Sequence, residues 1–223
     1  EALQVIEDND IDIVVSDVMM PLMNGLELCA KIKNNIEYSH IPVILLTAKV
    51  LPEAKVEGFS YGADAYVEKP FTILQLHMQI RNLLKLRTTF QQHMTSFLPD
   101  AKPEEKEEEE ETGIQLTPQD QEFIKKMQEI IEQQLADESF SIDTLAAEMN
   151  MSRSNFYRKL KALSGMPPND YLKNCRLNKA AQLLKEGYRV TEVFERTGFG
   201  SSSYFAKCFK AKFGVLPKDY ISN

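Results

Sequence analysis

Three short apolar runs that end in polar or charged residues constrain the fold of the first half of the chain. They are IDIVVSD (11–17), IPVILLTA (41–48) and DAYVEKP (64–70), and segments of helical pattern lie between them. This alternation predicts a parallel sheet with helices on both faces. The adjacent apolar residues Val14 and Val15 predict that the first strand is buried on both faces.

Polar side chains stand where these strands end. Asp17, Thr47 and Lys69 each follow a different apolar run. The carboxyl ends of parallel strands meet at one edge of a sheet, which is where function collects in α/β folds. A lone carboxylate there is costly to bury unless it is paired, so we expect Lys69 to pair with Asp17. The alternative is that Asp17 only caps the following turn.

A long helix is predicted from about Thr72. Its apolar residues recur every three or four positions, at Ile73, Leu76, Ile80, Leu83 and Phe90. This spacing favours packing against the protein's own sheet. The alternative is a homodimer seam, although the charge of Arg87 on the same stripe weakens that interpretation.

Charge divides the chain into three segments. Residues 1–98 carry 8 basic and 12 acidic side chains, and residues 99–118 carry 2 and 8, with seven glutamates among residues 104–111. The middle segment is predicted to be an extended acidic linker, or alternatively a decoy for the basic module that follows. Residues 119–223 carry 16 basic and 13 acidic side chains, although the whole chain has a net charge of −7. A basic module on an acidic protein indicates nucleic-acid binding.

Composition argues against several other classes of protein. No apolar run approaches the roughly 18 residues that a membrane helix needs, and we see no signal peptide. Cys29, Cys175 and Cys208 are far apart and in no metal-ligand spacing, and the three histidines are isolated. We therefore expect a cytoplasmic protein with no metal site built from cysteine or histidine.

The C-terminal segment contains an internal repeat. Residues 152–171 superpose on residues 201–220 at an offset of 49, and the matched pairs are Phe156/Phe205, Leu160/Phe209, Gly165/Gly214, Pro168/Pro217 and Tyr171/Tyr220. Each copy reads as helix, tight turn and helix, with Asn150 or Gly198 at the turn and a serine cap, Ser152 in the first copy and Ser201 or Ser202 in the second. This pattern predicts two helix-turn-helix units.

Helical geometry selects the residues that would face the DNA. With the matched apolar residues inside, helical geometry turns six side chains outward: Ser154, Arg158, Lys161, Ser203, Lys207 and Lys210. Arg153, at the start of the first recognition helix, is also a candidate for DNA contact. Arginine can bond bidentately to guanine, and serine and lysine can contact bases or phosphates. The alternative for any single residue is a solvated surface position. Residues 167–187 predict one long helix that would hold the two recognition helices about 34 Å apart, one turn of DNA.

From about residue 120 to its end, the chain resembles an AraC-type DNA-binding domain. The stretch GFGSSSYFAKCFKAKFGVLPKDY is similar to that family's signature. The resemblance implies double-stranded DNA as the partner. Phe194 departs from the family, which usually has a small residue there, and a bulky ring at this place could splay the two helices of the second unit.

The N-terminal segment resembles the receiver domains of two-component response regulators. The motifs SDVMMPLMNG, ILLTAK and GADAYVEKPF occur in the family's order. The resemblance implies that Asp17 is the phosphoacceptor and that Thr47, Tyr66 and Lys69 are switch residues. It also implies Mg²⁺ as a cofactor, bound by Asp17 and the backbone carbonyl of Met19, and a histidine kinase domain as phosphodonor.

Receivers also carry an acidic pair at the end of an earlier strand, and this sequence has none. We therefore expect a fragment with weak or absent magnesium binding. The predicted fold is an incomplete flavodoxin-like receiver, a doubly wound α/β parallel sheet (1–98), followed by the linker (99–118) and an all-α domain with two helix-turn-helix units (119–223). Together these segments resemble the C-terminal part of hybrid two-component regulators, whose parent chain could be anchored in the inner membrane.

The leading functional interpretation is a transcription regulator controlled by an aspartyl phosphate. The alternative is an interaction or dimerisation module whose receiver no longer accepts phosphate. A phosphohydrolase with Asp17 as nucleophile needs a second acid close behind it, and Val18 and Met19 are not acidic. We therefore expect no enzyme activity from this chain, although the parent polypeptide could carry a kinase.

Overall fold

A computed structural model describes residues 1–48, 61–96 and 116–222. Contacts divide the chain into two units, each with its own hydrophobic core. Unit 1 comprises Glu1–Phe90 and Glu111–Ile124, and unit 2 comprises Gln91–Glu110 and Lys125–Asn223. Most of the segment of helical pattern between the second and third apolar runs, and most of the acidic segment at 99–118, lie outside the described residues.

Unit 1 is built on the parallel sheet that the apolar runs predict. Its strands are β1 (Val14–Asp17), β2 (Val43–Thr47) and β3 (Ala65–Glu68), in the spatial order β1-β2-β3. The register sets Asp17 opposite Leu46 and Thr47 opposite Glu68, so the three carboxyl ends lie along one edge.

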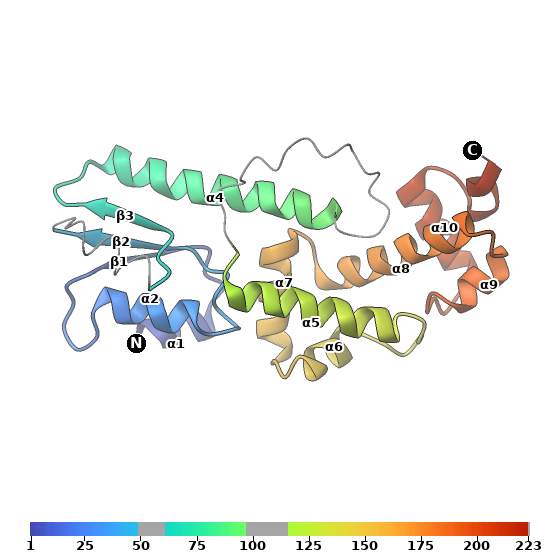
Figure 1. Cartoon of the computed structure of the whole chain (residues 1–223), viewed down its shortest axis with the longest axis horizontal. Coiled ribbons are helices and arrows are strands. Elements are labelled where there is room, and N and C mark those ends of the chain that lie inside the picture. Colours follow the sequence, from blue (N-terminus) through green and yellow to red (C-terminus); the bar gives the residue numbers. More distant parts are fainter. Residues whose placement is uncertain (49–60, 97–115, 223) are drawn as a thin grey trace. The chain divides into compact units, whose positions relative to one another are not determined.

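Helices cover both faces of this sheet, as the alternating pattern predicts (Figure 1). Helices α1 (Ala2–Asp8) and α2 (Gly25–Lys33) lie on one face and α4 (Ile73–Ser96) on the other. The buried core between the sheet and the first two helices includes Ile6, Leu28, Cys29, Ile32, Val43 and Leu45. In α4, Arg87 forms an ion pair with Asp12 at 3.2 Å, which favours packing of the helix on its own unit.

The prediction that β1 is buried on both faces was wrong. Val14 is half-buried and packs against the core, whereas Val15 is 39% exposed. The reason is that β1 forms an edge of the described sheet. The central strand β2 has the double burial instead, because Ile44 and Leu45, which point to opposite faces, are both fully buried.

Unit 2 is helical throughout its described part, as predicted. Its elements are α5 (Pro118–Gln134, which begins in unit 1), α6 (Ile142–Glu148), α7 (Arg153–Ser164), α8 (Pro168–Lys185), α9 (Val190–Glu195), α10 (Ser202–Phe213) and the 3₁₀ helix η1 (Pro217–Ser222). Helix α8 is the long helix expected between the two repeats. In the part of the chain that is described, no helix has the length and hydropathy needed to cross a membrane.

The internal repeat is confirmed as two helix-turn-helix units, α6–α7 and α9–α10. Both turns use left-handed backbone, with φ of 55° at Asn150 and 63° at Gly198. Ser152 and Ser201 cap α7 and α10 by accepting hydrogen bonds from the amides of Asn155 and Tyr204. The matched apolar residues Phe156, Leu160, Phe205 and Phe209 are all buried.

Candidate functional site

The carboxyl edge of the sheet in unit 1 brings the predicted polar residues together. The Lys69 ammonium forms an ion pair with Oδ2 of Asp17. The Lys69 amide donates to the Thr47 carbonyl oxygen at 2.7 Å, which joins the ends of β2 and β3. The Met19 amide donates to Oδ1 of Asp17 at 3.2 Å. Asp17 therefore has a partner on each carboxylate oxygen.

These contacts keep the Asp17 carboxylate ionised. Its pKa is lowered, first by the hydrogen bond from Lys69 and then by the Met19 amide. The side chains of Asp17 and Lys69 are 35% and 39% exposed, so a reagent in solution can reach them. An exposed, ionised carboxylate next to a cation can act as a nucleophile, because the cation offsets the negative charge of an incoming group.

The other two predicted switch residues, Thr47 and Tyr66, are half-buried. Thr47 lies half-buried at the end of β2. Tyr66 lies on β3, three residues before Lys69, and its side chain packs against the core of unit 1. Burial raises the pKa of Tyr66 to about 12, so its phenol stays neutral at physiological pH.

A close backbone approach shapes the loop behind Asp17. Asn24 caps α2 by accepting a hydrogen bond from the Glu27 amide at 2.8 Å, and the Gly25 amide donates to the Val18 carbonyl oxygen at 2.9 Å. A Cβ added at Gly25 would lie 2.9 Å from the Asp17 carbonyl carbon and still closer to its oxygen. Glycine is therefore required where α2 begins.

Replacing Gly25 with alanine is expected to lower the free energy of unfolding of unit 1 by about 1–3 kcal/mol, because backbone must move to admit the methyl group. Urea unfolding of the full chain, followed by tyrosine fluorescence, measures the change. Gly200→Ala is the matched control: its added Cβ meets only the flexible end of the Glu138 side chain, so its cost should be smaller. Equal costs for the two variants would contradict a special requirement at Gly25.

The described residues do not by themselves fit the magnesium site that the receiver resemblance implies. Asp17 offers one carboxylate, and Lys69 already contacts its Oδ2 atom. Among the described residues, no group of three or more His, Cys, Asp or Glu side chains is placed to hold a metal ion. The acidic pair that receivers carry at a strand end has no counterpart among the described strand ends, since Glu7 and Asp8 lie at the end of α1.

The first candidate DNA-contacting surface is the outward face of α7. Ser154 and Lys161 are exposed, as predicted. Arg158 is half-buried, and its Nη2 donates to Oδ1 of Asn155 at 2.5 Å, which orients the guanidinium. Arg153 is exposed and forms an ion pair with Asp143 of α6 at 3.0 Å.

The matching surface lies on α10. Ser203, Lys207 and Lys210 are all exposed, as predicted. Sequence reasoning missed Tyr204, whose side chain is 52% exposed near the start of the same helix.

The burial of Lys159 was also not predicted from the sequence. This residue of α7 is fully buried, although it lies between Arg158, which was predicted to face outward, and Leu160, which was predicted to face inward. Its repeat partner is Cys208, a half-buried residue on the inner side of α10. The pairing of a lysine with a weakly polar residue was the available sign that position 159 faces inward. Lys159 is therefore no candidate for DNA contact.

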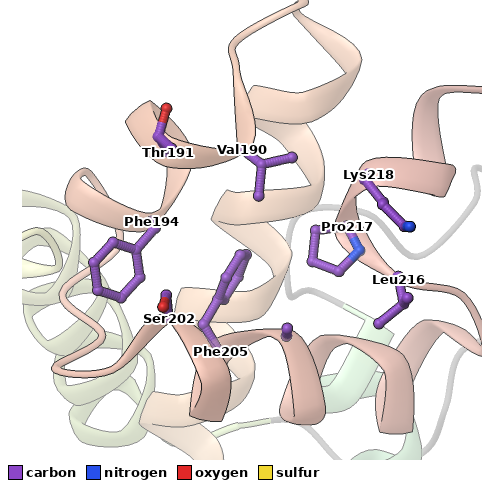
Figure 2. A pocket seen from close by; sticks show the side chains of 9 residues that line it. Val190, Thr191, Phe194, Ser202, Phe205, Leu216, Pro217 and Lys218 are labelled. Carbon is purple, nitrogen blue, oxygen red and sulfur yellow. The ribbon is translucent and has the colours of Figure 1, made fainter.

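Phe194 lies at the apolar cavity that Figure 2 shows between α9, α10 and η1. The cavity has a volume of about 260 Å³, and its lining includes Val190, Phe194, Phe205 and Pro217. The half-buried ring of Phe194 stands 6.3 Å from that of Phe205 between centroids. Helices α9 and α10 both form next to the bulky ring.

Two family models match this chain. Residues 1–81 match the response regulator receiver domain, and residues 145–223 match a helix-turn-helix domain. The receiver match covers Asp17, Thr47 and Lys69, and the second match covers both α7 and α10.

Some relatives are similar to almost the whole chain, and others are similar to one of its parts. "Histidine kinase P4" of Formosa agariphila is 35% identical over 98% of this chain, but the chain covers only 15% of that protein. "Transcriptional regulatory protein YvrH" of Bacillus subtilis is 44% identical over 43% of the chain and 38% of that protein. The C-terminal domain of the two-component response regulator yesN from Fusobacterium nucleatum is 30% identical, covering 45% of this chain and 98% of that structure, with a TM-score of 0.42.

The three strands with their polar edge and the paired helix-turn-helix units thus agree with both family matches. The chain joins a response regulator receiver domain to an AraC-type helix-turn-helix domain.

Proposed function

We propose that this chain is a sequence-specific, DNA-binding transcription regulator that aspartyl phosphorylation controls in a two-component phosphorelay. The observation that carries the proposal is the match between α7 and α10. At equivalent repeat positions, each helix presents a serine, a basic residue and a lysine on its outward face. Because the partner that we propose is DNA and its control is a phosphorelay, we place this segment in the cytoplasm.

The two helices are suited to adjacent segments of the major groove. The guanidinium of Arg158, oriented by Asn155, can bond to O6 and N7 of a guanine. Lys207 is its counterpart in α10 and is free to reach either a base or a phosphate. The exposed Ser154 and Ser203 lie near the starts of their helices, where recognition helices contact base edges.

The control step would be phosphoryl transfer to Asp17. A carboxylate oxygen of Asp17 attacks the phosphorus of a phosphohistidine on a kinase domain. The phosphorus–nitrogen bond breaks, the imidazole leaves, and an acyl phosphate forms. Lys69 would stay beside the new negative charge, and the Thr47 hydroxyl would approach the phosphoryl oxygens.

A second candidate is an interaction module, a homodimer for example, whose receiver does not accept phosphate. The lack of a three-ligand acidic group among the described residues favours it, because such a group would hold the magnesium ion that phosphoryl transfer uses. This candidate predicts DNA binding that does not depend on the chemical state of Asp17.

Replacing Arg158 with alanine is expected to weaken binding to a preferred DNA site by about 1–3 kcal/mol and to relax base preference at one position. Fluorescence anisotropy with selected and random duplexes measures both effects. Lys125→Ala, which removes an exposed charge on α5, is the matched control and should change neither. Equal losses on selected and random DNA would reduce Arg158 to a phosphate contact.

A further inference from the structure

The connection between α5 and α6 is tied to the middle of α8 by one side chain. Nη2 of Arg176 donates hydrogen bonds to the carbonyl oxygens of Asp137 and Phe140, both at 2.9 Å. Burial of the guanidinium lowers the pKa of Arg176, while Asp137 and Glu138 act in the opposite direction. Two backbone carbonyls of the segment that leads into α6 are thereby held against α8.

The same connection also meets the turn of the second helix-turn-helix unit. Gly198, in the turn between α9 and α10, has a φ of 63° and is buried. A Cβ added there would lie 2.5 Å from the Leu135 carbonyl oxygen, 3.0 Å from that of Asp137 and 3.1 Å from Nε of Arg176. No side chain larger than hydrogen fits between the turn and the connection.

These contacts connect the two helix-turn-helix units at a second place, in addition to α8. Along the chain, α6–α7 and α9–α10 are joined only through α8, with a short turn at each of its ends. Helices α6, α7 and α9 also pack against α8, and the junction adds a direct contact between the α5–α6 connection and the turn of the second unit. The contact of Gly198 and Arg176 with residues 135–140 connects the start of one helix-turn-helix unit to the turn of the other. Helix α6 begins at Ile142, just after residues 135–140, and α10 begins at Ser202, just after Gly198.

We propose that this junction, defined as residues 135–140, Arg176 and Gly198, sets the separation of the two DNA half-sites that the protein accepts. Arg176 is a positioning residue: it acts on the DNA through the placement of α7 and α10. The inference rests on the proposed function, since it assumes that both helices read the same duplex. It adds that half-site spacing is selected by a contact remote from the outward faces.

The test is a series of duplexes in which the selected half-sites keep their sequence and their separation changes by one or two base pairs. The full chain is expected to bind the selected spacing about tenfold or more tightly than its neighbours, the scale of one misplaced base contact. Arg176→Ala should flatten this profile to within about threefold, mainly by losing affinity at the selected spacing. Lys179→Ala, on the same helix, removes a charge but leaves the junction intact and should keep the sharp profile.

Arg176→Lys covers the case in which the alanine variant does not fold. A lysine ammonium can donate to the same carbonyl oxygens, but its side chain is shorter than that of arginine and holds them less firmly, so an intermediate profile is expected. Circular dichroism and thermal unfolding establish that each variant is folded. A sharp profile in folded Arg176→Ala, or in Arg176→Lys if the former is unfolded, would overturn the inference. A flat profile in the unaltered protein would instead contradict the proposed two-helix binding.

Discussion

Replacing Phe205 with alanine is expected to lower the free energy of unfolding of unit 2 by about 3–5 kcal/mol. Its side chain is 1% exposed and forms the centre of an aromatic cluster, with ring centroids 5.1 Å from Phe199 and 5.7 Å from Phe209. Truncation would also enlarge the adjacent cavity of about 260 Å³, and the surrounding helices cannot fully close over it. Urea unfolding followed by circular dichroism at 222 nm measures the loss.

Phe194→Ala is the matched control for this prediction. Phe194 faces the same cavity from α9 but is only half-buried, so its truncation removes less apolar contact and should cost roughly 1–2 kcal/mol. An equal or larger loss for Phe194→Ala would contradict the assignment of Phe205 as the centre of the cluster.

Replacing Asp17 with asparagine is expected to abolish phosphoryl uptake completely, because no other carboxylate among the predicted site residues is paired with Lys69. In the unaltered chain, we expect uptake from acetyl phosphate with magnesium to be slow. Asp17 supplies one carboxylate to a site that normally needs several oxygen ligands, so the anionic donor is poorly screened. Intact-mass spectrometry over time measures the gain of one phosphoryl group.

Asp10→Asn removes an exposed carboxylate outside the sheet edge and serves as the control for this measurement. The Asp10→Asn variant should gain mass at the same rate as the unaltered chain. Rapid, stoichiometric uptake by the unaltered chain would mean that the missing acids come from elsewhere, such as a second chain. Uptake by Asp17→Asn would contradict the assignment of the phosphoacceptor.

Local patterns were enough to predict the elements that carry the candidate sites. The strands follow from short apolar runs, and both turns follow from Asn150 and Gly198, residue types that tolerate left-handed backbone. The pairing of Asp17 with Lys69 was also predictable, because parallel strand ends share one edge of a sheet.

Features that depend on tertiary neighbours could not be predicted in the same way. The exposure of Val15 depends on which strand forms the edge of the sheet. The two adjacent valines, Val14 and Val15, do not indicate whether their strand is central or at the edge. The burial of Lys159 runs against the charge of its side chain. The contacts of Arg176 join segments 36 and 39 residues apart, a range at which periodicity gives no information.

The central claim is that two recognition helices of this chain read one DNA duplex. It is tested most directly by selecting duplexes from a random library with the full chain and footprinting the enriched sequences. Two recognition helices on one face predict an enriched bipartite sequence with two protected major-groove segments about 10 base pairs apart. Arg158→Ala should lose base preference in one segment and Lys207→Ala should weaken the other. A library that shows no enrichment, or a single protected segment that neither variant alters, would contradict the account.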